Sequence, residues 1–163
     1  MCQYLNVKNA NLLRLHWHIG ILAYLLIFSL ACGREEMRQT IPLMPVNFTV
    51  DLNRYDHSLR NPLSYKTFTR PRLQTDLVGL GGLLIVSSMD GNQIFAFDLA
   101  CPCEGRRDVL VTPTANGTAI CATCNSVFNT SFGLGTVQSG VTRVPLQRYT
   151  VQQQGEGIFW VRN

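Results

Sequence analysis

Four cysteines fall into two short pairs in the second half of the chain, with 17 residues between the pairs. The pairs read Cys101-Pro102-Cys103 and Cys121-Ala122-Thr123-Cys124. Thiolates bind soft metal ions and iron–sulfur clusters, and four of them can complete a closed site. Each pair lies beside a predicted strand, so two loop tips can meet around one centre. The spacing predicts a metal site and leaves the metal open.

Three other outcomes remain open for these thiols. In an oxidising compartment they would form two disulfides, most simply by pairing across the two loops. A zinc ion held by all four would serve only to join the loops. A mononuclear iron of the rubredoxin type is the third alternative.

Composition excludes several classes of function. The chain has 163 residues, of which 46% are hydrophobic and 15% charged, so it is not a disordered protein. A net charge of +4 without a basic run does not indicate a nucleic-acid partner. No Ser–His–Asp set, phosphate loop or carboxylate pair is present, so no catalytic residue is assigned, and we interpret Glu104 as a solubilising loop residue.

The N-terminal segment resembles a bacterial lipoprotein signal. Residues 19–31 carry no charge, but the stretch is shorter than the roughly 20 residues of a membrane-spanning helix. It ends Ser29-Leu30-Ala31-Cys32, similar to a lipobox, which implies a lipid on the Cys32 thiol. We therefore expect a signal peptide over 1–31 and anchoring to the inner or outer membrane of a bacterial envelope. A signal anchor or an ordinary signal peptide is the alternative, and Cys2 would have no role.

The remaining chain alternates as strands do. We expect a polar tether over 32–45 and one domain over 46–163, with all-β structure in a sandwich or small barrel. The predicted strands alternate in polarity, form short apolar runs or flank Gly-rich turns. They cover residues 46–52, 65–69, 83–86, 94–97, 108–112, 118–120, 144–151 and 158–161.

The cysteine region resembles the Rieske family, in which C-x-H and C-x-x-H motifs lie about 17 residues apart on loops between strands. The shared features are a strand before each motif and a Gly/Pro turn after the second. They lie in residues 82–86, 94–102, 105, 121–128, 135–140 and 145–149. The resemblance implies an antiparallel β-sandwich with two metal-binding loops and a 2Fe–2S cluster.

Both family histidines are cysteines here, at positions 103 and 124, and His57 is the only histidine after residue 31. The resemblance implies that Cys101 and Cys121 bind one iron, and that Cys103 and Cys124 bind the other. Without imidazole ligands, the potential should fall toward that of plant-type ferredoxins, roughly −400 mV.

The resemblance also implies surroundings for the cluster. Pro102 and Ser126 would lie next to it, with the Ser126 hydroxyl bonded to a bridging sulfide. Phe128 replaces a tyrosine of high-potential members, and the family's extra disulfide is absent because Arg106 and Thr123 stand in its places. Asn125 replaces a glycine and tolerates a left-handed backbone.

These inferences predict a membrane-anchored carrier of single electrons, or a subunit of a larger oxidoreductase, which exchanges electrons with a redox protein. The alternative is a structural or interaction lipoprotein with the same fold and a zinc ion, disulfides or no cofactor.

Overall fold

The computed structural model describes residues 41–163 of the chain, which form two antiparallel β-sheets and one short 3-10 helix. The predictions for the signal peptide, Cys32 and most of the tether lie outside these residues. No helix within residues 41–163 is long and apolar enough to span a membrane.

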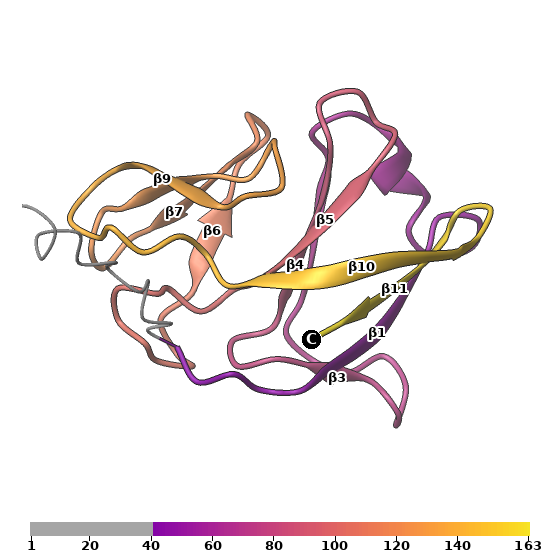
Figure 1. The fold of residues 1–163 in the computed structure, drawn as a ribbon, viewed down its shortest axis with the longest axis horizontal. Helices are drawn as coiled ribbons and strands as arrows, with labels where there is room; N and C mark the ends of the chain where they lie inside the picture. The colour runs from indigo at the N-terminus through magenta and orange to yellow at the C-terminus, as the bar shows by residue number, and fades with distance from the viewer. Residues whose placement is uncertain (1–40) are drawn as a thin grey trace, which may run out of the picture. The chain divides into compact units, whose positions relative to one another are not determined.

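The larger sheet has seven strands in the order β2-β4-β5-β10-β11-β1-β3 (Figure 1). Its strands are β1 (Val46–Asp51), β2 (Tyr65–Phe68), β3 (Leu77–Val78), β4 (Leu83–Ser87), β5 (Ile94–Asp98), β10 (Arg148–Gly155) and β11 (Ile158–Arg162). Each neighbouring pair is antiparallel. The prediction of an all-β antiparallel fold is therefore confirmed.

The smaller sheet has four strands in the order β6-β7-β8-β9. They are β6 (Val111–Pro113), β7 (Thr118–Cys121), β8 (Val127–Asn129) and β9 (Thr136–Ser139). All four lie between β5 and β10 in the sequence, although β5 and β10 are direct neighbours in the larger sheet. The chain thus leaves the larger sheet after β5, forms the smaller sheet and returns.

Alternation of polar and apolar residues explains the first strand. In β1 the side chains of Val46, Phe48 and Val50 are buried, and the residues between them are not. These three belong to a cluster formed largely by side chains of the larger sheet itself. In it Phe48 packs against Phe68 with ring centroids 4.5 Å apart and the rings tilted by 44°. The period of two in the sequence therefore separates the core face from the outer face.

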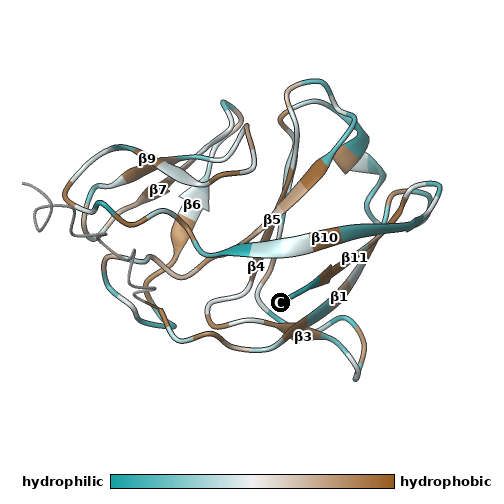
Figure 2. Ribbon diagram, viewed as in Figure 1, coloured by the Kyte–Doolittle hydropathy of each residue, from teal (hydrophilic) through white to brown (hydrophobic). Residues whose placement is uncertain are grey.

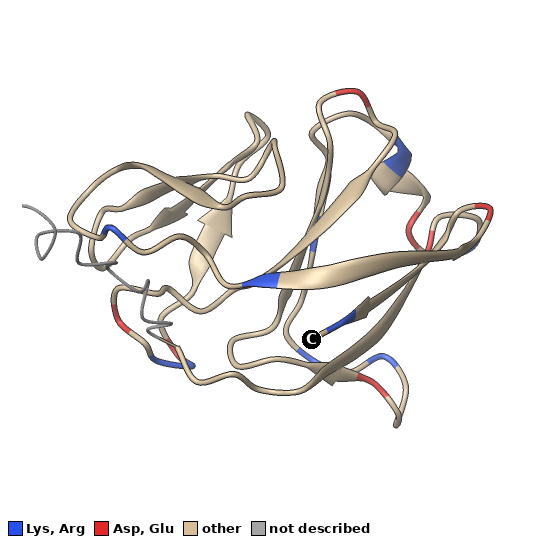
Figure 3. Cartoon of the chain, viewed as in Figure 1, with Lys and Arg blue, Asp and Glu red and all other residues tan. Residues whose placement is uncertain are grey.

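Strands β4 and β5 are apolar on both faces because both faces are covered. Leu83 and Ile85 face the cluster of β1, whereas Leu84 and Phe97 face a second cluster that includes residues of the smaller sheet, among them Phe128. Figure 2 shows hydrophobic colour along these two strands, and Figure 3 shows charged residues mainly in loops and turns. This second cluster joins the two sheets and extends to the cysteines.

Candidate metal centre

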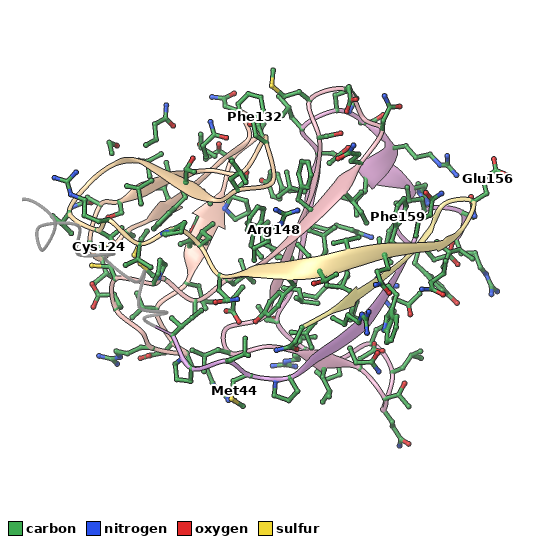
Figure 4. All side chains as sticks on the ribbon, in the orientation of Figure 1. Met44, Cys124, Phe132, Arg148, Glu156 and Phe159 are labelled. Atoms are coloured by element: carbon green, nitrogen blue, oxygen red, sulfur yellow. The ribbon has the colours of Figure 1, made fainter. Side chains whose placement is uncertain are left out.

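Two loops that border the second hydrophobic cluster carry the four cysteines. Loop one, residues 101–110, connects β5 of the larger sheet to β6 of the smaller one, and loop two, residues 121–126, connects β7 to β8. Figure 4 shows Cys124 at one end of the smaller sheet and Phe132 at the opposite end. The predicted placement of both motifs on loops between strands is therefore confirmed.

Backbone hydrogen bonds give loop one its shape. The Cys101 N–H donates to Val109 O at 2.9 Å, and the Gly105 N–H donates to Cys101 O at 3.0 Å. Gly105 has a φ of 63°, a left-handed conformation that glycine adopts without cost. These bonds close a tight turn that presents Cys103 at the surface, where its side chain is exposed.

Loop two is closed in the same way. The Cys121 N–H donates to Ser126 O at 3.0 Å, which brings the chain back on itself within six residues. Asn125 has a φ of 55°, the left-handed conformation that the sequence predicted this residue to tolerate. Cys124 precedes it and is half-buried.

The two loops bring the thiols together in an inner and an outer set. The Sγ atoms of Cys101, Cys121 and Cys124 all lie within 4.8 Å of one another, and Cys101 and Cys124 are 3.6 Å apart. Cys101 and Cys121 are fully buried in the apolar cluster between the sheets. Cys103 lies within 4.8 Å of Cys124 on the outer side.

Burial and hydrogen bonding shift the pKa values of the Cys101 and Cys124 thiols in opposite directions. Burial, followed by hydrogen bonding to Cys121, raises the pKa of Cys101 to about 12. Burial would also raise the pKa of Cys124, but hydrogen bonds from the Ser126 hydroxyl and the Ser126 N–H outweigh it and lower this pKa to about 7. One thiolate is therefore available near neutral pH, at the junction of the inner and outer sets.

Ser126, which the resemblance implies would lie next to a cluster, is in contact with Cys124. Its Oγ is buried 3.2 Å from the Cys124 Sγ and accepts the Thr142 N–H at 3.4 Å. Pro102 is buried between the two cysteines of loop one.

Asp98 and Glu104, near the cysteines, were missed by the functional predictions from sequence, whereas Gly140 was noted there only as part of a Gly/Pro turn. Gly140 packs against Ser126 so closely that a Cβ at Gly140 would lie 2.6 Å from the Ser126 Oγ. Asp98, three residues before Cys101, binds the backbone that enters loop one. Glu104, interpreted as a solubilising residue, has a carboxylate oxygen within 4.8 Å of the Cys103 and Cys124 sulfurs.

The donor set fits two kinds of centre. Four thiols at two loop tips can ligate a 2Fe–2S cluster or one tetrahedral ion. A tetrahedral ion with 2.3 Å bonds holds its sulfurs about 3.8 Å apart, close to the Cys101–Cys124 separation. In the ligand assignment that the sequence resemblance implies, a two-iron cluster would bind Cys101 and Cys124 through different irons, at a larger separation than the 3.6 Å observed here.

Comparison with known proteins gives no family assignment. No protein-family model matches the chain, and no curated protein matches it. One similar solved structure is a complex of reduced oxygenase and oxidized ferredoxin in carbazole 1,9a-dioxygenase, with a TM-score of 0.44 and 17% identity over 72% of this chain and 93% of that chain.

A second similar structure is that of a protein assigned as an NADH-dependent nitrite reductase small subunit from Mycobacterium tuberculosis. Its TM-score is 0.40, with 14% identity over 73% of this chain and 96% of that chain. Likenesses of this degree are too distant to carry a function, so the function has to be inferred from the residues of this chain.

Proposed function

We propose that Cys101, Cys103, Cys121 and Cys124 hold an iron-based redox centre, a 2Fe–2S cluster, and that the protein carries single electrons. The observation that carries this proposal is the convergence of all four cysteines at the tips of two neighbouring loops, with Cys124 within reach of the other three. When bound, such a cluster accepts and releases one electron at a time. The residues around the four cysteines would determine how far such a centre is shielded from water and how a redox partner reaches it.

Burial of the ligands supports an electron-transfer role. Cys101 and Cys121 are enclosed by the apolar cluster, while Cys103 is exposed and Cys124 is half-buried. A centre held by these ligands would be shielded on one side and accessible on the other. A redox partner could therefore approach the outer pair, while the inner side excludes water.

The shape of the loops argues against a purely structural ion. Each loop is closed by its own backbone hydrogen bonds, at the Cys101 N–H in loop one and the Cys121 N–H in loop two. Asp98 holds the strand end that leads into loop one. Because these backbone hydrogen bonds already hold both turns, a metal is not needed to shape the loops. Its contribution would be the redox chemistry that it supplies.

The surroundings favour a low-potential carrier without catalysis. Phe128 is fully buried beside the site and offers no hydroxyl, whereas the Ser126 hydroxyl hydrogen-bonds to the thiolate of Cys124. Among the described residues within this apolar cluster, none is a histidine that could couple proton transfer to electron transfer. Four thiolate ligands and the absence of imidazole support a potential near that of plant-type ferredoxins, roughly −400 mV.

Membrane attachment is part of the proposal. The lipobox-like sequence ending at Cys32 supports a lipid anchor there, in a bacterial envelope. A lipid at this position would hold the carrier near membrane-bound redox partners. A Cys32→Ser variant should therefore move from the membrane fraction to the soluble fraction without losing its absorption spectrum.

A single tetrahedral ion, most simply zinc, is the second candidate. The 3.6 Å separation of Cys101 and Cys124 favours it, because this is the spacing of two ligands on one ion. Such a protein would be a structural or binding lipoprotein that undergoes no redox change at the site.

Metal analysis of the full chain separates the two candidates. We expect the protein, purified without oxygen in mild detergent, to contain iron and acid-labile sulfide in equal amounts, with visible charge-transfer absorption that bleaches on reduction. Replacing any of the four cysteines with serine should reduce the iron content. Thr123→Ser, a control substitution in loop two between Cys121 and Cys124, should not. One zinc ion per chain without sulfide would contradict the carrier and support the second candidate.

A further inference from the structure

A second group of ligand atoms lies on the outer side of the centre. One carboxylate oxygen of Glu104 and the sulfurs of Cys103 and Cys124 all lie within 4.8 Å of one another. The Glu104 N–H donates to Cys101 O at 3.2 Å, so the turn of loop one fixes the position of its backbone. A divalent ion could bind these three side chains without entering the apolar cluster.

The Glu104 carboxylate has no other partner among residues 41–163. None of the hydrogen bonds or ion pairs of this region involves its oxygens. The nearby guanidinium of Arg106 binds Asp108 through two hydrogen bonds of 2.6 and 3.0 Å. Because Asp108 engages this cation, Glu104 remains available to a metal ion.

The outer and inner groups share one ligand. Cys124 belongs to both, whereas Cys101 and Cys121 are fully buried and Cys103 is exposed. An ion that arrives from solvent therefore meets Cys103, Glu104 and Cys124 before it meets the buried pair. The ion can then exchange its other ligands while it stays bound to Cys124.

We propose that Cys103, Glu104 and Cys124 form a capture site, which binds an incoming divalent metal ion and passes it to the buried cysteines. This inference rests on the proposed function only in taking the four cysteines as metal ligands. Glu104 is a transient ligand, present during loading and displaced in the loaded protein.

The loading step exchanges ligands and protons and involves no redox change. At capture, Cys103 and Cys124 bind as thiolates and release their protons to solvent, while the ion stays divalent. Transfer breaks the bond between the ion and the Glu104 oxygen. It forms bonds to Cys101 and Cys121, whose protons also pass to solvent.

Cobalt(II) loading of the full chain tests the proposal. The reduced, metal-free protein in mild detergent is mixed rapidly with Co²⁺, and the sulfur-to-cobalt absorption is followed in time. We expect Glu104→Gln to slow loading about tenfold, because it removes one ligand and one attracting charge, and to leave the final absorbance unchanged. Glu104→Asp should recover part of the rate.

Glu156→Gln is the matched control. Glu156 is exposed in the turn between β10 and β11, so the substitution removes the same charge away from the cysteines, and it should load at the wild-type rate. Equal rates for Glu104→Gln and wild type would overturn the proposal. A lower final absorbance for Glu104→Gln would also overturn it, because Glu104 would then be a permanent ligand. Failure of the wild-type chain to bind cobalt would overturn it as well.

Failure of this inference can be distinguished from failure of the proposed function. Cobalt loading reports the order in which ligands bind and requires neither iron nor sulfide. The iron and sulfide content of the purified protein reports the nature of the centre and is independent of the loading rate.

Discussion

The Tyr149 hydroxyl donates a 2.6 Å hydrogen bond to the carboxylate of Asp98, and both side chains are buried. The same carboxylate accepts the N–H groups of Leu80, Gly81 and Ala100 at 2.7 to 2.9 Å. One buried anion thereby connects β10, the turn before β4 and the residue that precedes the first cysteine. Its three backbone donors replace the water that burial removes.

Replacing Tyr149 with phenylalanine should lower the free energy of unfolding by about 1.5–3 kcal/mol, the value of a hydrogen bond to a charged group. The remaining N–H donors keep Asp98 satisfied, so the variant should fold and bind metal. Urea denaturation of the reduced, metal-free protein measures the change. A loss below 0.5 kcal/mol, on the order of the experimental error, would contradict the assigned role.

The same pair predicts a loss of stability at alkaline pH. Burial, with the hydrogen bond and negative charge of Asp98, raises the pKa of Tyr149 well above its usual value. A raised folded-state pKa contributes stability that is complete below the unfolded-state value, about 10, and is lost as pH rises beyond it. Wild-type stability should therefore fall more steeply above pH 10 than that of Tyr149→Phe, as measured by urea denaturation across this range.

Gly140→Ala should disturb the metal centre through Ser126. Gly140 has a φ of +111°, and an added Cβ would press on the Cα and Oγ of Ser126. We expect a loss of about 1–3 kcal/mol and a shifted visible spectrum in the loaded protein. Gly155→Ala is the control, because its Cβ would have no neighbour within 4 Å. Similar effects of the two substitutions would contradict the role of this contact.

Removing the Ser126 hydroxyl should make Cys124 less reactive. Although burial acts to raise it, the pKa of Cys124 is lowered to about 7 by the hydroxyl and N–H of Ser126. Ser126→Ala should raise this pKa, so alkylation of Cys124 at pH 7 should slow by about threefold in the metal-free protein. Mass spectrometry of the Cys124 peptide over a pH series measures the rate. Ser139→Ala, at an exposed position of β9, should leave it unchanged.

Asp56 predicts a loss of stability in acid. Its buried carboxylate binds Lys66 at 2.9 Å and Arg72 at 2.8 Å. Burial acts to raise its pKa, but the hydrogen bonds from Arg72 and Lys66 outweigh burial and lower it. A lowered folded-state pKa contributes stability that is present above the ordinary value, about 4, and is lost as pH falls through the folded-state value.

Asp56→Asn should therefore cost about 2–4 kcal/mol at neutral pH, because it leaves two cations without their anion. Below pH 4 its stability should approach that of the wild type. Urea denaturation at pH 7 and pH 3 measures both values. Asp108→Asn, in an exposed ion pair, should change neither value measurably, and a constant difference for Asp56→Asn at both pH values would contradict the assigned linkage.

The larger sheet could be predicted largely from the sequence, because its strands carry strong patterns. Alternation marked β1, and an apolar run marked β4 beside the Asp90-Gly91-Asn92 turn. Strands β3, β8 and β9 were missed: they have two, three and four residues, too few for a period to show. The equally short β6 and β7 were found because they flank an Asn-Gly turn at Asn116 and Gly117. The strand expected from residue 144 begins at Arg148, since residues 144–147 form the return from the smaller sheet.

The segment between β1 and β2 is more structured than its polar composition indicated. The strands predicted from the sequence leave residues 53–64 unassigned, yet the segment forms a 3-10 helix at His57–Arg60, with Leu59 fully buried. Arg72 also lies over the rings of Phe48 and Phe68, at 5.2 and 5.0 Å from their centroids. Contacts of this kind between residues far apart in the chain leave no periodic pattern, so the sequence could not show them.

The cysteines of the candidate site were found from their spacing, but their arrangement was not. Spacing predicts that Cys101 and Cys124 share a centre, whereas their 3.6 Å separation depends on how two loops from different elements meet. Glu104 was missed for the same reason. A single charge beside Cys103 can be recognised as a candidate ligand only when loop one and loop two are known to lie side by side.

The path of the chain between β5 and β10 has a consequence for how such a protein could change over time. The two strands pair directly, with Phe97 opposite Arg148, and the Asp98 N–H donates to Gln147 O at 2.8 Å. All four cysteines lie in the excursion between these two points. A single deletion or exchange at one place could therefore remove or replace the whole portion that carries the four cysteines, and a short turn would suffice to reconnect the larger sheet.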